Sequence, residues 1–252
     1  MLEALPTPRT MAKRRLDLLL VERGLVESRE KARARIMAGE VLVEDRPIDK
    51  PGTLVDDRAQ VRLLATPRYV SRGGDKLEHA LRAFRVDVQG LVCADVGAGT
   101  GGFTDCLLQH GARRVYAIDV GYGQLHPRLR QDPRVVVMER TNARYLGRLP
   151  EPLDLATVDV SFISLTKVLP PLLPNLRPGG AIVALFKPQF EARRGEVPRR
   201  GVIRDPLLHA TLIGRFVAWA VGQGLRVLGP VRSPVPGAEG NLEFFFLLRP
   251  HA

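Results

Sequence analysis

The feature that most restricts the fold is a glycine-rich stretch at residues 95–105, DVGAGTGGFTD. The apolar segment GLVCA precedes it, and the segment CLLQHG that follows is typical of a short helix. A strand, a glycine turn and a helix in this order form the unit with which many α/β proteins bind nucleotides. The stretch therefore predicts a nucleotide-type ligand and leaves open which one.

Strand-like and helix-like segments alternate from Gly73 to the end of the chain. Strands are expected at 91–96, 114–119, 135–138, 154–159 and 180–187, and helices at 75–84, 101–110, 164–173 and 205–223. This alternation predicts a Rossmann-like α/β fold with a mostly parallel, doubly wound sheet. The closing segments 225–233 and 242–249 bring the sheet to seven strands and predict an antiparallel edge.

The sequence before this region predicts a smaller, separate α+β domain. The expected divisions are an N-terminal extension at 1–10, the small domain at 11–66, a linker at 67–72 and the large domain at 73–252.

Within the small domain, RRLDLLLVERG predicts a first helix. Ser28 is a suitable N-cap for a second helix, SREKARARIMAG. In this second helix Ala32, Ile36 and Met37 are expected to face the interior, while basic side chains cover a broad outer face.

The charge predicts a polyanionic partner. Lys and Arg number 38 against 27 Asp and Glu, which leaves a formal net charge of +11. RNA or DNA is the first expectation; an anionic membrane surface and an arginine-rich genome are the alternatives.

No membrane or export segment is expected. No stretch approaches the roughly 18 apolar residues of a membrane span, and the N-terminus has no apolar signal core. A cytoplasmic protein without a metal site is therefore expected, with Cys93 and Cys106 as small core residues rather than a disulfide.

Two ligands compete for the glycine loop. Residues 97–102 match the dinucleotide pattern G-x-G-x-x-G, and Asp119 ends the next strand, where a ribose-binding acid belongs. Asp95 argues against NAD, because a carboxylate beside the loop repels a pyrophosphate. S-adenosylmethionine carries no phosphate and has a cationic sulfonium, so the residues favour this methyl donor.

Two further segments follow strands that flank the loop. Asp159, in DVSFIS, ends the fourth strand and is expected in the ligand crevice beside the first strand. Asn142, in ERTNAR, is placed to contact an adenine edge, although asparagine at such a position also serves turn chemistry.

Lysine is scarce in this arginine-rich chain, so its positions are informative. Lys76 lies in SRGGDKL, and Lys187 follows a very apolar strand in LFKPQFE. With Asp159 and Glu243 they form a Lys-Asp-Lys-Glu set. Such a set suits methyl transfer to a ribose hydroxyl, because a lysine can take the proton or stabilise the developing alkoxide while the carboxylates orient the lysines.

At this point the sequence resembles a known family. The segments YVSRGGDKL, DVGAGTGGFTD, DVGYGQL, DPRVVVMERTNAR, DVSFISL, KPQFE and GNLEFF follow the order and spacing of the TlyA (hemolysin A-like) ribosomal RNA methyltransferases. These join an S-four-type RNA-binding domain to an FtsJ/RrmJ-like methyltransferase domain. The resemblance implies 2′-O-methylation of cytidine in 16S rRNA, 23S rRNA or both, with S-adenosylmethionine as donor.

The resemblance also implies site residues. The catalytic set would be Lys76, Asp159, Lys187 and Glu243. Donor-binding positions would include Asp95, Gly97, Gly99, Thr100, Gly101, Gly102, Phe103, Asp119, Asn142 and Asp159. RNA-contacting residues would be Arg15, Arg29, Lys31, Arg33, Arg35 and Arg72.

Three other functions stay open on the sequence. The chain is alternatively an inert ribosome-assembly factor, a cytolysin or an NAD-dependent oxidoreductase. The partners expected are ribosomal RNA and ribosomal subunits, and the oligomeric state is left undetermined.

Overall fold

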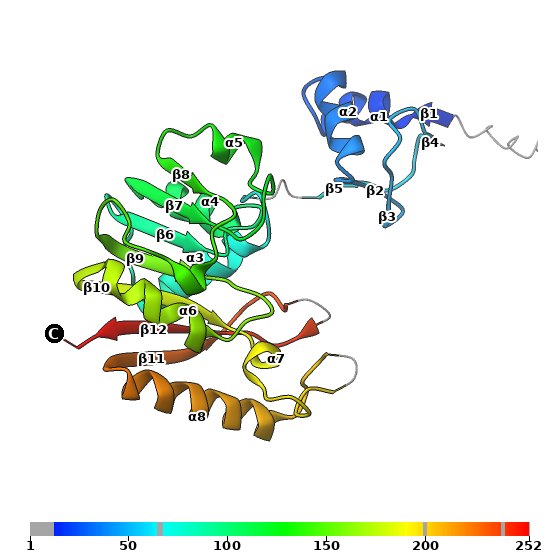
Figure 1. The fold of residues 1–252 in the computed structure, drawn as a ribbon. Coiled ribbons are helices and arrows are strands. Elements are labelled where there is room, and N and C mark those ends of the chain that lie inside the picture. Colours follow the sequence, from blue (N-terminus) through cyan, green and yellow to red (C-terminus); the bar gives the residue numbers. More distant parts are fainter. Residues whose placement is uncertain (1–12, 65–67, 199–200, 238–239, 252) are drawn as a thin grey trace, which may run out of the picture. The chain divides into compact units, whose positions relative to one another are not determined.

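A computed structural model describes residues 13–64, 68–198, 201–237 and 240–251 of the chain (Figure 1). The chain divides into two compact units, Met1–Thr66 and Pro67–Ala252. The extension expected at 1–10 lies outside the described residues, as does Pro67 of the expected linker.

The first unit packs two helices against small antiparallel sheets. Its elements are β1 (Lys13–Arg15), α1 (Leu16–Glu22), α2 (Arg29–Met37), β2 (Val41–Val43), β3 (Arg46–Pro47), β4 (Leu54–Asp56) and β5 (Val61–Leu63). β1 pairs with β4, and β2 lies between β3 and β5. Leu16, Leu20 and Ile36 are fully buried between these elements, and burial of such side chains contributes about 1.5–3 kcal/mol each.

The two helices differ from expectation in two details. The first helix begins at Leu16, because Lys13–Arg15 pairs as a strand with β4. α2 begins as predicted, since Ser28 Oγ accepts from the Lys31 amide at 3.3 Å. The expectation for Met37 was wrong: its side chain is 61% exposed. Ala32 and Ile36 lie one turn apart and fill the buried face, which leaves Met37 about 100° around the helix from Ile36.

The second unit is built on the expected seven-stranded sheet. Its strands are β6 (Val92–Val96), β7 (Arg114–Ile118), β8 (Val135–Met138), β9 (Leu153–Val158), β10 (Leu176–Phe186), β11 (Leu225–Arg232) and β12 (Phe244–Pro250), in the order β11-β12-β10-β9-β6-β7-β8. β12 pairs antiparallel with β10 and β11, and the other pairs are parallel. The prediction of a doubly wound α/β fold is confirmed.

Helices cover both faces of this sheet (Figure 1). They are α3 (Gly73–Phe84), α4 (Gly102–Gln109), α5 (Pro127–Arg130), α6 (Leu165–Leu172), α7 (Pro188–Glu191) and α8 (Pro206–Gly222), with 3₁₀ turns η1 (Ala143–Tyr145) and η2 (Leu173–Asn175). Strand residues alternate between two cores: Cys93 packs with α3 and α4, and Ala94 with α6 and α8. Cys93 and Cys106 are buried and free, as expected.

The chain reverses its direction of winding at β6. This strand lies between β7, which follows it in sequence, and β9, which is reached by a longer crossover. Ligands of such sheets bind at the carboxyl ends of the strands at this point. Gly97 follows β6 and Asp159 follows β9, and the Asp159 amide donates to Val96 O at 2.9 Å. The two segments are therefore held side by side.

Residues 68–72, expected as part of a linker, pack on the second unit. Tyr69 is 2% exposed within the core shared with α3 and α4. The Val70 amide donates to Asp105 Oδ2 at 2.9 Å. This segment therefore belongs to the framework that leads into α3.

Candidate active site

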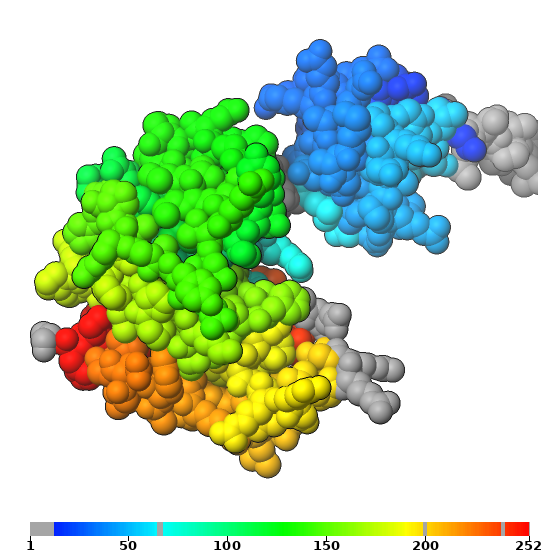
Figure 2. All heavy atoms as spheres, viewed as in Figure 1, coloured from blue at the N-terminus to red at the C-terminus, as the bar shows by residue number. Residues whose placement is uncertain are grey.

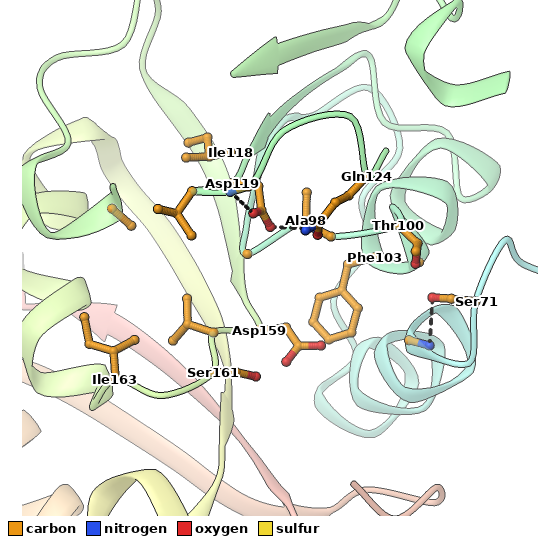
Figure 3. Close-up of a pocket in the computed structure, with 18 of the residues that line it drawn as sticks. Ser71, Ala98, Thr100, Phe103, Ile118, Asp119, Gln124, Asp159, Ser161 and Ile163 are labelled. Atoms are coloured by element: carbon orange, nitrogen blue, oxygen red, sulfur yellow. Dashed lines mark hydrogen bonds between the residues drawn. The ribbon is translucent and has the colours of Figure 1, made fainter. Parts of the chain in front are cut away.

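A cavity of about 610 Å³ opens at the carboxyl ends of β6, β7 and β9 (Figure 3). The expected site residues that line it are Arg72, Lys76, Gly97, Gly99, Thr100, Gly102, Phe103, Asp119, Asn142, Asp159 and Lys187. The tertiary structure thus brings most of the residues expected for the donor site and for catalysis into one chamber.

The glycine loop approaches neighbouring groups too closely for a side chain. Gly97 has φ +86°, and a Cβ there would lie 2.3 Å from the carbonyl oxygen of Asp159. A Cβ at Gly102 would lie 2.2 Å from Ser71 Oγ. Glycine at these positions therefore lets the loop pack directly against the Asp159 segment and against Ser71, at the wall of the cavity.

Asp119 fastens the loop to the end of β7. Its Oδ2 accepts from the Gly99 amide at 2.8 Å and its Oδ1 from the Gly121 amide at 2.6 Å. Figure 3 shows its side chain among those that line the cavity. Each carboxylate oxygen keeps a further lone pair, so Asp119 can still accept from ribose hydroxyls.

Asn142 performs the turn chemistry that the sequence left open. It caps η1, with Oδ1 accepting from the Arg144 amide at 3.0 Å. Its side chain also borders the cavity. The amide nitrogen remains as the group that can donate to a ligand there.

Asp95 does not occupy the position expected of it. It is fully buried and does not line the cavity. Its Oδ2 accepts from the Thr104 amide at 2.8 Å and from Thr104 Oγ1 at 2.7 Å, inside the first turn of α4. The alternating side-chain direction of β6 explains this, because Asp95 points under the loop rather than over it. Asp119 and Asp159 are the carboxylates that face the ligand space.

Gly101 also has a structural role. It is not among the residues that line the cavity, and its φ is +96°. A Cβ there would lie 2.3 Å from Leu129 Cδ1 and 2.8 Å from Leu125 Cδ1. Gly101 therefore lets α5 and the preceding turn pack against the start of α4.

The buried position of Asp95 shifts the pKa of its carboxyl. Loss of solvent raises the pKa of its carboxyl to about 7, the nearby charge of Asp159 also raises it, and the Thr104 hydrogen bonds only partly offset this. The folded protein therefore keeps the proton to a higher pH than the unfolded chain, whose Asp titrates near 3.8. The resulting stabilisation is complete below about pH 4 and is lost as the pH rises through 7.

We expect the free energy of unfolding of the second unit to fall as the pH rises from about 4 to about 7 and to change little through Asp95 above that. The full linkage of Asp95 is of the order of 4 kcal/mol. Urea unfolding followed by the fluorescence of Trp219, the single tryptophan of the chain, reports on this unit. Asp95→Asn should flatten the profile, and equally steep profiles in both proteins would exclude Asp95 as its source.

Lys187 and Asp159 form the first half of the expected catalytic set. Lys187 follows β10, and its Nζ lies 2.6 Å from Asp159 Oδ1 and donates to Ser161 Oγ at 3.0 Å. The Lys187 side chain is 10% exposed. β9 and β10 are neighbours in the sheet, so their ends bring this pair together.

Lys76 and Glu243 form the second half. Lys76 Nζ donates to Glu243 Oε2 at 2.6 Å, with side chains 12% and 3% exposed. α3 supplies the lysine, and the residue before β12 supplies the glutamate. A Cβ at Gly237 would lie 2.1 Å from Glu243 Oε1, so the glutamate is closely packed from the other side. Lysines 76 and 187 both reach the cavity, each held by its own carboxylate.

Glu191 supports a loop of the site, and sequence reasoning missed it. It ends α7, four residues after Lys187, and bridges to the loop that carries Asp159. Its Oε1 accepts from the Leu165 amide at 2.7 Å and its Oε2 from Ser164 Oγ at 2.5 Å. Burial raises the pKa of Glu191. The position of Glu191 in the KPQFE segment could have indicated a role, but only the tertiary structure brings it to its partners Ser164 and Leu165.

The basic residues expected to contact RNA differ in whether they already form ion pairs within the protein. In the first unit Arg15 and Arg29 both bind the buried Asp17, at 3.0 Å and 2.9 Å, and hold its pKa at about 2. Lys31 pairs with Glu27, and Arg35 with Glu40. Within the described ranges Arg33 and Arg72 form no ion pair, and Arg72 borders the cavity.

The described residues contain neither a metal-binding cluster nor a membrane-spanning helix. Among them, no group of three His, Cys, Asp or Glu side chains is arranged to hold a metal ion. No helix in these ranges has the length and apolar character needed to cross a membrane.

Comparison with known proteins agrees with this geometry. Residues 69–249 match the FtsJ-like methyltransferase family, and residues 14–61 match the S4 domain.

Similar proteins extend over nearly the whole chain. The "Putative rRNA methyltransferase YqxC" of Bacillus subtilis is 50% identical over 95% of this chain and 86% of its own length. The "16S/23S rRNA (cytidine-2'-O)-methyltransferase TlyA" of Mycobacterium tuberculosis is 47% identical over 95% and 91%. A solved structure, "Putative hemolysin from Streptococcus thermophilus", is 44% identical, with a TM-score of 0.73 over 95% of this chain and 89% of that one. The chain therefore belongs to the FtsJ-like methyltransferase family, in the branch that carries an S4 domain ahead of the methyltransferase domain.

Proposed function

We propose that this protein transfers a methyl group from S-adenosylmethionine to the 2′-hydroxyl of a cytidine in ribosomal RNA. The observation that carries the proposal is the pair of lysines at the cavity, each held by a carboxylate at 2.6 Å, beside the glycine loop. The name of the TlyA relative, which is a 16S/23S rRNA (cytidine-2'-O)-methyltransferase, supports cytidine as the nucleotide and 16S and 23S rRNA as candidate substrates.

The cavity residues fit S-adenosylmethionine as the donor. Gly97 and Gly102 let the loop pack closely against its neighbours at the wall of the cavity, and Asp119 offers acceptors for ribose hydroxyls. The carboxylates of Asp119 and Asp159 face the same space, which suits a ligand with positive charge better than a pyrophosphate. The bound donor supplies an electrophilic methyl group on a cationic sulfur.

The lysines act on the acceptor hydroxyl. That hydroxyl is a weak nucleophile, and negative charge develops on its oxygen as its proton passes to solvent water while the new oxygen–methyl bond forms. Lys187 Nζ, fixed by Asp159 and Ser161, is proposed to donate to this oxygen and stabilise the charge. Lys76, fixed by Glu243, is proposed to orient the same nucleotide. Because both lysines are already held in position, the reaction requires no further free energy to arrange them.

The S4 unit is proposed to bring ribosomal RNA or a ribosomal subunit to the site. Its match to the S4 domain and the charge of +11 support an RNA partner. A ribosomal RNA substrate supports the further proposal that the protein acts in the cytoplasm.

The decisive experiment uses ribosomal RNA and ribosomal subunits from cells that lack this protein. They are incubated with the protein and a donor labelled in its methyl group, and ribose methylation is mapped by mass spectrometry. Incorporation on a cytidine 2′-oxygen is expected in 16S rRNA, in 23S rRNA or in both. Donor binding without any labelled RNA would favour an inert assembly factor.

RNA affinity is expected to fall steeply with salt. Binding of arginines and lysines to phosphates releases counterions, so an interface with about five contacts loses roughly 100-fold in affinity between about 50 and 200 mM salt. Fluorescence anisotropy with a labelled rRNA fragment measures this slope. An affinity that does not change with salt would contradict an electrostatic RNA interface.

A further inference from the structure

A partly buried acid outside the catalytic set joins the two segments that carry Lys187 and Asp159. Glu191 ends α7; its Oε1 accepts from the Leu165 amide at 2.7 Å, and its Oε2 accepts from Ser164 Oγ at 2.5 Å. Glu191 does not line the cavity, and among the residues that the structure describes it forms no ion pair. Burying a carboxyl group is unfavourable unless it is hydrogen-bonded, so these two bonds fix the position of the side chain.

The contacts of Glu191 fix the start of α6. Ser164 is the N-cap of this helix, and its Oγ also accepts from the Thr166 amide at 3.1 Å. The first amides of a helix have no partner within the helix, and their partial positive charge attracts a carboxyl oxygen. Leu165 is 1% exposed. The first turn of α6 is therefore anchored both by packing and by Glu191.

The Asp159 segment, residues 159–163, runs from β9 to this helix start and is held at both ends. At its beginning the Asp159 amide donates to Val96 O at 2.9 Å, and at its end it meets the two residues bound by Glu191. Between these points Phe162 has φ +62°, a left-handed conformation that a non-glycine residue keeps only where its surroundings impose it. Release of the far end is therefore expected to let the segment relax and to move its side chains.

One short turn, α7, connects Lys187 to Glu191. The Phe190 amide donates to Lys187 O at 2.9 Å and closes this turn. Lys187 Nζ contacts the first part of the Asp159 segment, at Asp159 Oδ1 and Ser161 Oγ, and Glu191 contacts the helix start that follows the segment. In Figure 2 the yellow atoms around this turn lie next to the yellow-green atoms of the region around the Asp159 segment. Two contacts, one turn apart, thus determine how the lysine and its carboxylate meet.

We infer that Glu191 is a positioning residue for methyl transfer, which holds the Asp159 segment against α7 so that Lys187 Nζ stays at the cavity. The inference rests on the proposed function and adds a residue that acts through Lys187 without touching substrate or donor. Its hydrogen bonds carry this role rather than its charge. A glutamine of the same length can also accept from the Leu165 amide, and it can donate to Ser164 Oγ.

The test compares three substitutions of Glu191. Glu191→Gln keeps the length of the side chain and both hydrogen bonds without the charge, whereas Glu191→Asp keeps the charge but is one methylene too short to reach Ser164 and Leu165. Glu191→Ala removes both bonds. Glu151→Ala is the matched control, because Glu151 is also partly buried and binds Arg114 at 2.6 Å, but it precedes β9, at the end of the sheet away from the cavity.

Methylation of rRNA from cells lacking the protein is expected to show a kcat about 10- to 100-fold lower for Glu191→Asp and Glu191→Ala, since small displacements of reacting groups cause such losses. Glu191→Gln and Glu151→Ala should stay within about threefold of the wild type. KM for rRNA and donor affinity by calorimetry should not change in any variant. A Glu191→Asp protein with the normal kcat, or a Glu191→Gln protein as slow as Glu191→Ala, would overturn the inference.

The Lys187→Met background tests whether Glu191 acts through the lysine. In that background Glu191→Asp should slow methylation by less than about twofold more, because the group that it positions is already absent. A further loss as large as in the wild-type background would show that Glu191 supports the fold in general, and it would overturn the positioning role.

Hydrogen–deuterium exchange of the protein without RNA gives a readout that does not depend on methylation. The Leu165 amide should exchange at least about tenfold faster in Glu191→Asp than in the wild type, and at the wild-type rate in Glu191→Gln. If the wild-type protein methylates no rRNA, the proposed function fails, and this exchange still decides whether Glu191 holds the segment. Equal exchange in the three proteins would show that it does not.

Discussion

Replacing Lys187 by methionine is expected to slow methyl transfer to ribosomal RNA by about 10²- to 10⁴-fold. Lys187 Nζ is the ammonium that Asp159 and Ser161 hold at the cavity, at 2.6 Å and 3.0 Å. Methionine keeps most of the side-chain volume but cannot stabilise charge on the acceptor oxygen. The effect should appear in kcat, measured under single-turnover conditions with labelled donor.

The control for this change is Lys167→Met. Lys167 is an exposed lysine of α6 with no part in the cavity. This variant should retain full activity, and Lys187→Met should still bind the donor by calorimetry. A Lys187→Met protein that is folded, binds donor and methylates at the normal rate would remove Lys187 from the mechanism.

Substitution of Asp159, the partner of Lys187, tests whether the two residues act as a unit. Asp159→Asn and the double variant with Lys187→Met are expected to be about as slow as Lys187→Met alone, because residues that act as a unit show strongly non-additive losses. Full additivity of the two losses would show that the pair does not act together.

Alanine at Gly97 is expected to lower donor affinity by at least about 30-fold, roughly 2 kcal/mol. The new Cβ would lie 2.3 Å from Asp159 O and 2.8 Å from Asp159 C, and the residue would be held at φ +86°. Relief of this contact must separate the glycine loop from the Asp159 segment. The donor cradle and the catalytic carboxylate are thus displaced together, and calorimetry with S-adenosylmethionine measures the loss.

Gly214→Ala is the matched substitution. Gly214 lies within α8, and a Cβ there meets nothing within 4 Å. Alanine at this position should leave donor binding intact and stabilise the helix by about 0.5–1 kcal/mol. Should Gly97→Ala bind the donor as well as Gly214→Ala does, the close contact with Asp159 is not what shapes the cradle.

The sequence predicts the fold well where its signals are local. Five apolar strands and four helices of alternating type dictate a doubly wound sheet, because helices between parallel strands must cover both of its faces. Ser28 identifies the start of α2 because capping involves only neighbouring residues. The prediction that the first helix includes Arg14 and Arg15 was wrong, since these residues pair as a strand with β4, about 40 positions away in the sequence.

The site residues, too, were predicted well where the signal is local and less well where it depends on the tertiary structure. The glycine spacing indicated the ligand loop, and the choice of a methyl donor was right, although the argument from Asp95 does not hold because that carboxylate does not face the cavity. The Lys-Asp-Lys-Glu set was identified from four residues in marked places. Asp95 was misplaced, because its charge is visible in the sequence but the direction of its side chain is not. Its contact with Thr104 inside α4 depends on how β6 is seated under the loop.

The chain's own order of residues thus determined the class of fold, the ligand loop and the kinds of group available for catalysis, because these follow from periodicity and short spacings. Tertiary structure alone decided which groups meet: Lys76 with Glu243 across 167 positions of sequence, and Glu191 with the loop of Asp159. It also decided which acids face the cavity and which are sealed beneath it. Contacts of this kind arise from strand order and packing, which bring together residues that no local pattern relates.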